Sequence, residues 1–160
     1  MLGVRALAHD RLVLTGVDAT VAFCLRQVPA ILAHRDADWM RERMYPDAVP
    51  HDAARAAEWR RLTQPELRQL FEAAQHTLEA DLAAFEPRRG RVEFPASHLK
   101  AWMNAVNQAR VVLTEQHQFD ARDMQRAEFD AASSRDAALL QIQVLGYLLQ
   151  VLVEHALEGA

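Results

Sequence analysis

The sequence predicts a mainly α-helical protein: a bundle of several helices around a central C-terminal helix, with a small antiparallel sheet of two or three strands. The chain has 160 residues, of which 51% are hydrophobic, and this suits one domain with a full core. Apolar residues recur at helical spacing through most of the chain, whereas β character is confined to the N-terminus and residues 91–94. We therefore expect residues 1–160 to form a single domain.

The charge and the cysteine content bear on partners and compartment. A net charge of −4 gives no basic surface of the kind that nucleic acid or anionic lipid requires. The lone Cys24 cannot form an intrachain disulfide, and residues 1–15 lack the pattern of a signal peptide. Polar residues interrupt the apolar stretch 139–157, so we expect a buried helix there instead of a membrane span. These features favour a cytoplasmic protein without a membrane partner.

Three short runs predict the sheet. Residues 4–8 and 11–15 flank His9 and Asp10, a two-residue link that suits an antiparallel hairpin. An isolated hairpin is marginally stable, so a third strand is needed. Residues 91–94 are the candidate for it.

The first helix should begin after Asp18, which is a suitable N-cap residue. Pro29 lies inside this helix and requires either a kink or a break there. A short helix is expected to follow and to end at Met44, before a loop at residues 45–50.

Two further helices are expected before Pro87. Residues 51–62 are rich in alanine and form the first of them. Thr63 and Glu66 have the spacing of a capping box, and Pro65 between them suits a first helical turn. This pattern predicts that a separate long helix begins at Thr63. Its apolar face consists of Leu67, Leu70, Phe71, Ala74, Leu78, Leu82 and Phe85.

The next helix spans about residues 96–116, a short one lies near 120–129, and the last begins at Ser133 or Ser134. The apolar arc of the last helix covers roughly 240°, far wider than the arc of a surface helix. That helix is therefore either central to the bundle or one half of a dimer interface.

The segment 102–113 is the most informative part of the sequence. On a helix it places Arg110 within an apolar arc, with Asn107 at the edge of that arc. A guanidinium there needs partners, because burying an unpaired charge costs several kcal/mol. We expect a polar lock in which Asp81 or Glu154 is the counter-ion of Arg110.

An alternative for these residues is a recess lined by Asn107, Arg110 and Tyr147 that binds a small anion or serves an enzyme. Arginine matches a carboxylate or phosphate through two parallel hydrogen bonds. The sequence has no catalytic triad order or phosphate loop, so no catalytic residue and no cofactor are expected. No metal is expected either, because the Glu and His residues at 72–79 lie opposite the apolar arc of their helix.

Arg88, Arg89 and Arg91 form the tightest basic run. A nucleic-acid site needs more cations and stacking aromatic side chains, so we expect these residues on a solvated edge. Nucleic-acid binding is accordingly the third and weakest of the candidate functions.

The segment 102–113 also carries a resemblance. It reads W-x-x-A-x-N-x-x-R-x-V-L, and Glu58–Thr63, Met44–Pro46 and Gly146–Leu148 add matches elsewhere. On these residues the sequence resembles a bacterial family known as domain of unknown function two-zero-one-seven. The resemblance covers nearly the whole length and implies a small cytoplasmic bacterial protein, often encoded beside the adaptor of the Clp protease. It implies no established activity. The fixed positions of the pattern are Trp102, Ala105, Asn107, Arg110, Val112 and Leu113.

The sequence as a whole favours a non-enzymatic factor that binds or regulates other proteins. The resemblance suggests a link to Clp-dependent proteolysis, with the Clp adaptor or chaperone as partner. A homodimer through the last helix is a further expectation. An enzyme or anion-binding protein built around Arg110 remains the alternative.

Overall fold

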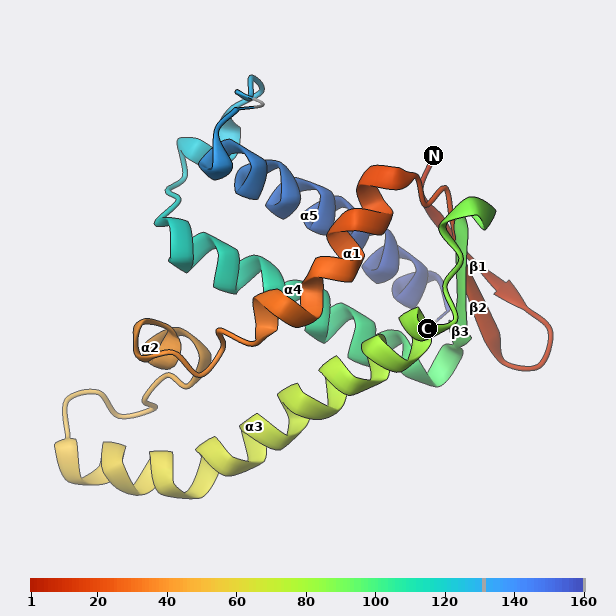
Figure 1. Cartoon of the computed structure of the whole chain (residues 1–160). Helices are drawn as coiled ribbons and strands as arrows, with labels where there is room; N and C mark the ends of the chain where they lie inside the picture. Colours follow the sequence, from red (N-terminus) through yellow and green to blue (C-terminus); the bar gives the residue numbers. More distant parts are fainter. Residues whose placement is uncertain (131, 160) are drawn as a thin grey trace.

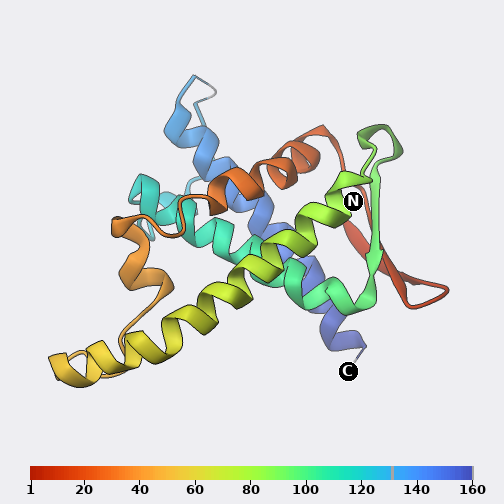
Figure 2. The same cartoon turned by 60° about the horizontal axis from the view of Figure 1, so that its bottom comes forward.

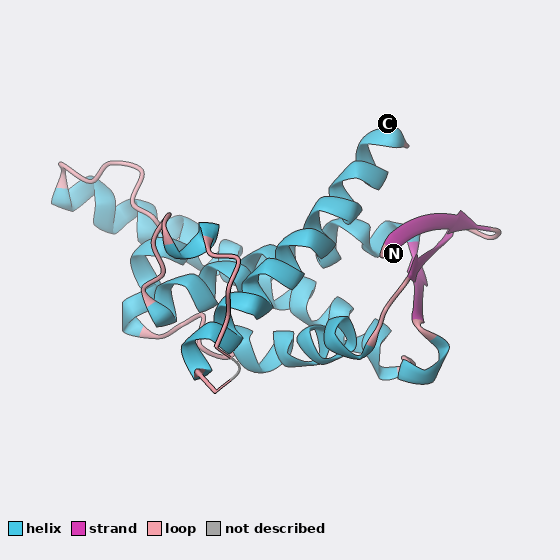
Figure 3. Cartoon of the chain, turned by 90° about the horizontal axis from the view of Figure 1, so that it is seen from above, coloured by secondary structure: helices cyan, strands magenta, loops and turns pink. Residues whose placement is uncertain are grey.

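A computed structural model describes residues 1–130 and 132–159 and confirms the mainly helical class (Figure 1). Helices α4 (Leu99–His117) and α5 (Ser134–Glu158) pack along each other at the centre, and α1 and α3 cross α4. The sheet lies at one end of the bundle, near both termini (Figure 3). The remaining elements are β1 (Gly3–Leu7), β2 (Arg11–Thr15), α1 (Ala19–Leu32), α2 (Arg41–Met44), α3 (Ala53–Ala83) and β3 (Arg91–Pro95).

The sheet has the predicted third strand. Its order is β1-β2-β3, both pairs are antiparallel, and Leu14 lies opposite Val4 on one side and Val92 on the other. His9 and Asp10 adopt positive φ angles of 60° and 55°. Leu7 pairs with Arg11, so the link has three residues, 8–10, and the predicted two-residue link is wrong by one residue. The sheet therefore covers the core with its buried residues, Leu12, Leu14, Val92 and Phe94.

Helix α1 begins as predicted and runs without a break. The Asp18 carboxylate accepts a hydrogen bond from the Val21 amide at 2.9 Å. The helix continues through Pro29 to Leu32, so the alternative of a break after Val28 is wrong. Val28 and Leu32 are both buried in the core, and their packing offsets the hydrogen bond that proline cannot make.

Helix α3 is one continuous helix of 31 residues, so the prediction of a separate helix at Thr63 is wrong. Asp52 caps it, and the Thr63 hydroxyl instead donates to the carbonyl oxygen of Trp59 at 2.8 Å. Pro65 is exposed, so water can solvate the carbonyl that the missing proline N–H leaves free. The N-terminal half of α3 projects from the body of the molecule (Figures 1 and 2).

Helix α5 begins at the predicted cap, where Ser133 accepts from the Asp136 amide at 3.2 Å. Residues 120–129 contain only a 3₁₀ turn, Asp123–Gln125, in place of the expected short helix. Among the described residues, α5 alone is long and apolar enough to cross a membrane, contrary to the expectation from its interrupting polar residues. In this fold it packs against α4, α1 and β1 through Leu139, Ile142, Leu145, Leu148 and Leu152.

Candidate functional site

A groove of about 540 Å³ runs between α3 and α4 and is closed at one end by α2. The buried and half-buried apolar residues of its lining include Met44 from α2, Phe71 and Ala74 from α3, and Val111 from α4. Concave sites with apolar walls and a few convergent polar groups are typical of ligand binding. The groove is therefore the best candidate for a functional site among the described residues.

The amide side chains of the groove come from α4. Asn107 and Gln108 follow Asn104 by three and four residues, so each is a neighbour of Asn104 on the helix surface. Gln108 is only 7% exposed, and its Oε1 has no hydrogen-bond partner among the described residues. An unsatisfied buried acceptor costs about 1–3 kcal/mol. Because this oxygen is buried, a ligand in the groove could reach it only after the Gln108 side chain moved.

The charged residues of the groove lining are both cations. Arg43 stands at the α2 end, where its Nε donates to Glu115 at 2.6 Å. Lys100 stands in the first turn of α4 and forms no ion pair with any described residue. The protein as a whole has a charge of −4, so the groove is electrostatically distinct from the rest of the molecule.

Trp102 forms the central tie between α3 and α4. Its indole Nε1 donates to the Asp81 carboxylate at 2.8 Å, and its ring stacks on Phe94 with centroids 4.5 Å apart. His98 Nδ1 lies 2.9 Å from the same carboxylate. The Asp81 carboxylate therefore binds both Trp102 and His98. The spacing of residues in the sequence did not predict these two partners. The apolar members of the pattern, Ala105, Val112 and Leu113, are buried around it.

Arg110 does not have the predicted counter-ions. Asp81 bonds to Trp102, and Glu154 accepts from Gln150 Nε2 at 2.8 Å near the exposed end of α5. The half-buried guanidinium instead lies against Gly146, where a Cβ atom would be 3.3 Å from its Nε. Glycine at this position lets the arginine approach the α5 backbone.

The structure does not bring the predicted recess residues together. Asn107 lines the groove toward α3, whereas Arg110 faces α5 and does not line the groove. Tyr147 is exposed on α5 beside Gly146. The Arg110 Nε is buried and has no partner among the described residues. Asn107 and Arg110 therefore belong to two different contacts of α4.

The basic run on the sheet edge is partly neutralised. Arg89 pairs with Glu86 at 2.8 Å, Arg91 lies 3.5 Å from Glu93, and Arg88 is exposed. The described residues also contain no group of three or more His, Cys, Asp or Glu residues that could hold a metal ion. Neither observation adds a second site to the groove.

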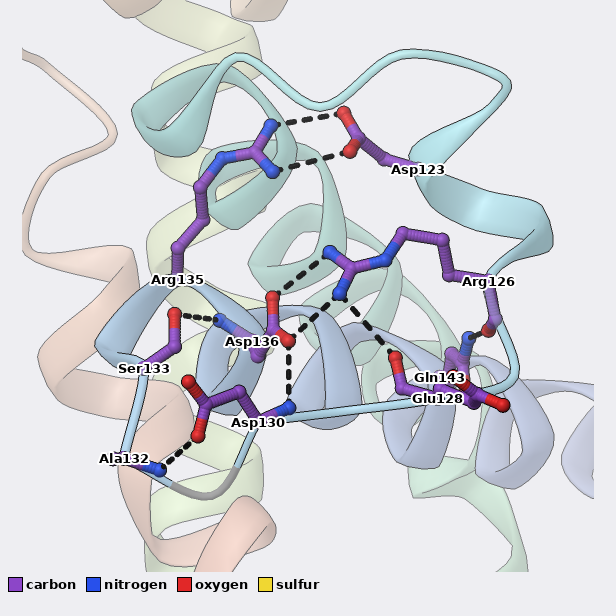
Figure 4. Close-up of polar contacts among 9 residues, drawn as sticks. All are labelled: Asp123, Arg126, Glu128, Asp130, Ala132, Ser133, Arg135, Asp136 and Gln143. Atoms are coloured by element: carbon purple, nitrogen blue, oxygen red, sulfur yellow. Dashed lines mark hydrogen bonds and ion pairs between the residues drawn. The ribbon is translucent and has the colours of Figure 1, made fainter.

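A set of arginine–carboxylate pairs fixes the loop between α4 and α5 (Figure 4). Buried Asp136 accepts from Arg126 Nη1 and Nη2 at 2.9 and 2.8 Å and from the Asp130 amide at 2.8 Å. Asp123 accepts in the same way from the Nη1 and Nη2 atoms of Arg135.

The Arg135 bonds hold the pKa of Asp123 at about 2, and the Arg126 bonds lower the pKa of Asp136. We call Asp123, Arg126, Arg135 and Asp136 the loop clasp. In the sequence, the only sign of the loop clasp is that Ser133 and Asp136 have the spacing of a helix cap. That spacing predicts where α5 begins but not the arginine partners.

Residues 4–156 match the family model described as Domain of unknown function (DUF2017). The protein belongs to this family. The match includes the groove, the Trp102 tie and the loop clasp. Comparison with curated proteins and with solved structures gives no match. The DUF2017 description assigns no activity, so a function has to be inferred from the geometry of the site.

Proposed function

We propose that this DUF2017 protein is a non-enzymatic binding factor that takes a segment of a partner protein into the groove between α3 and α4. The observation that carries the proposal is the groove itself, a concave surface of about 540 Å³ with apolar walls, three amide side chains and two cations in its lining. A polypeptide segment supplies apolar side chains that match the walls of this groove, and backbone N–H and C=O groups that match its amide side chains.

The surface beyond the groove supports a macromolecular ligand. Leu70, Leu62 and Trp59 are 64%, 54% and 43% exposed on α3. At 100° per residue they share an arc of about 80° with Ala73 and Thr77 of the groove lining. Part of this stripe is on the projecting half of α3 (Figure 2). Apolar surface that continues a groove is typical of protein-binding faces.

A peptide selection tests the proposal. A phage-displayed library of random nonapeptides is selected on the wild-type protein, on Ala73→Trp and on Ala54→Trp. Ala73 is exposed and lines the groove, so tryptophan there fills it without altering the core, whereas Ala54 is exposed on α3 outside the groove. We expect sequences that bind the wild type and Ala54→Trp but not Ala73→Trp. Peptides that bind all three proteins equally would contradict a role for the groove.

The cytoplasmic Clp system is the source of partners that the family resemblance suggests. We propose the Clp adaptor or chaperone as the protein that supplies the segment. Titration of each purified protein into the DUF2017 protein should give saturable binding that Ala73→Trp weakens at least tenfold. Absence of binding to both would remove this partner assignment and leave the groove proposal to the peptide selection.

A homodimer is a separate proposal, supported by the outer face of α5. Leu140, Tyr147 and Leu157 are large apolar side chains exposed on this helix. Apolar side chains gathered on one helix are a common basis of self-association. Light scattering across a hundredfold range of concentration should show a dimer, and a monomer throughout would exclude it.

Anion binding at Arg110 is the second candidate function. The observation that favours it is the buried Nε, which has no partner among the described residues. Phosphate titrated into the protein should raise its melting temperature, and Arg110→Lys should abolish that rise, because lysine cannot bind bidentately. An equal rise in the two proteins would exclude this candidate.

A further inference from the structure

The N-terminal part of α3, residues 53–65, projects from the body of the molecule, and we call it the arm (Figure 2). We infer that, in the free protein, the arm of a second copy occupies the groove, so that two copies pair antiparallel through α3 about a two-fold axis. This inference goes beyond the proposed function, because it says what covers the groove before a partner segment binds there.

The arm has little packing within its own chain. Of residues 53–65, Ala56 alone is buried. An isolated helix of about 12–15 residues is marginally stable in water, and most helices in proteins are stabilised by packing of an apolar face. Trp59 and Leu62 form such a face on the arm, yet they are 43% and 54% exposed. The arm therefore presents apolar side chains that no described part of the same chain covers.

The apolar stripe on α3 is complementary to itself. Trp59 and Leu62 are on the arm, and Leu70 and Ala73 continue the stripe into the lining of the groove. When two helices pair antiparallel about a two-fold axis, residues equally far from the axis on its two sides face each other. An axis at Glu66 places Leu62 opposite Leu70 of the second copy. The same axis places Trp59 opposite the small Ala73 of the second copy, so the indole ring enters the groove.

Other positions of the axis match the stripe less well. An axis one turn earlier, at Leu62, places Glu66 opposite Glu58 of the second copy and leaves Leu70 at the end of the pair. An axis one turn later, at Leu70, places Leu62 opposite Leu78, which is buried within its own chain. The axis at Glu66 is therefore the position that brings exposed apolar side chains together.

The charges along α3 fit this pairing except at the axis itself. Arg55 faces Thr77 of the second copy, which lines the groove together with Lys100. Asp52 lies 3.5 Å from Arg55 and neutralises its charge. Two copies of Glu66 meet at the axis, and like charges that face each other are destabilising. Glu66→Gln should therefore strengthen the pair, by about twofold to fivefold in the dissociation constant.

The size of the contact sets its strength. From Trp59 to Ala73 the helix is about 21 Å long, and a helix with its side chains is about 10–12 Å wide. A strip of this size is well below the roughly 800 Å² per partner that stable complexes bury. We therefore expect a weak, reversible dimer, which a segment that binds the groove more tightly displaces.

Cysteine cross-linking tests the pair. Glu66→Cys places two thiols at the axis, while the native Cys24 is buried. We expect mild oxidation to give a disulfide-linked dimer. Glu58→Cys is the matched control, because Glu58 is also exposed on the arm but its two copies would lie about 24 Å apart. Adding Ala73→Trp to the Glu66→Cys protein should slow cross-linking about tenfold, since it places a second indole opposite Trp59.

Two charged substitutions test the register in solution. Leu62→Glu and Leu70→Arg should each be monomeric where the wild type pairs, because each sets an unpaired charge against a leucine. Both leucines are exposed, so neither change should alter folding. An equimolar mixture should form a heterodimer, in which the new carboxylate faces the new guanidinium and the two remaining leucines face each other. Sedimentation equilibrium measures this, with Tyr147→Glu in every protein to exclude association through the outer face of α5.

The outcomes separate this inference from the proposed function. Equal cross-linking of Glu66→Cys and Glu58→Cys, or a mixture that stays monomeric, would overturn the inference, while Ala73→Trp-sensitive peptides would still support the proposed function. Cross-linking that Ala73→Trp does not slow would overturn the occupation of the groove. Specific cross-linking at Glu66→Cys without any Ala73→Trp-sensitive peptide would support the pair and contradict the proposed function.

Discussion

Among single residues, Trp102 makes the hydrogen bond on which the packing of α3 against α4 depends most. Trp102→Phe keeps an aromatic ring on Phe94 but removes the bond to the largely buried Asp81 carboxylate. We expect the free energy of unfolding in urea to fall by about 1–3 kcal/mol. Trp39→Phe is the control, because Trp39 is exposed and its replacement should change stability by less than about 0.5 kcal/mol. A Trp102→Phe protein as stable as this control would show that the Trp102–Asp81 hydrogen bond does not stabilise the packing of α3 against α4.

Gln108 should lower the stability of the free protein, because its buried Oε1 has no partner among the described residues. Gln108→Leu has a similar shape and no polar atom, so we expect it to raise the free energy of unfolding by about 1 kcal/mol or more. Loss of stability in Gln108→Leu would show that Gln108 has a structural partner instead.

Arg110 and Gly146 should be energetically coupled. Alanine at position 146 would normally stabilise a helix by about 0.5–1 kcal/mol, but its Cβ would lie 3.3 Å from Arg110 Nε and Nη2. We expect Gly146→Ala to be more favourable by at least about 0.5 kcal/mol in an Arg110→Ala background than in the wild type. A double-mutant cycle in urea measures this difference. Equal effects in the two backgrounds would mean that the guanidinium does not restrict this position.

At the level of elements, the loop clasp makes the α4–α5 connection sensitive to acid. The pKa of Asp123 is lowered to about 2 by its bonds to Arg135, and that of Asp136 is lowered by Arg126. A carboxylate with a depressed pKa in the folded state stabilises it above the ordinary value near 3.8, and this contribution is lost as the pH falls to about 2.

Unfolding midpoints measured between pH 5 and pH 2 test the clasp. The wild type should lose more stability over this interval than Asp123→Asn or Asp136→Asn, in which the titrating carboxylate is absent. Asp38→Asn is the control, since Asp38 is exposed and pairs with Arg41 only at the surface. Parallel pH curves for the wild type and the two clasp variants would contradict this assignment.

The elements were predictable where local chemistry decides them. The Asp18 and Ser133 caps, the hairpin and the third strand all follow from short-range patterns, and the structure has each of them. The Thr63 capping box failed because its hydroxyl can also bond back to the Trp59 carbonyl inside a continuing helix. Local spacing cannot decide between these two arrangements.

The site was less predictable because it depends on which faces of different helices meet. Periodicity placed Asp81 and Arg110 on inward faces, yet Asp81 bonds to Trp102 and Arg110 packs on Gly146. Both partners are distant in sequence, and the indole N–H competes for the same carboxylate. Gln108 escaped prediction because a glutamine on an amphipathic helix gives no signal until the neighbouring helix is in place.

For the whole molecule, the central claim is that α3, α4 and α2 form a groove that binds a segment of another protein. Heteronuclear NMR of the labelled protein, titrated with a peptide from the selection, locates the ligand most directly. We predict shifts at Ala73, Lys100, Asn104 and Asn107 and at the Nε2 amide group of Gln108. Shifts confined instead to the outer face of α5 around Tyr147, or to Arg88–Arg91, would contradict the account.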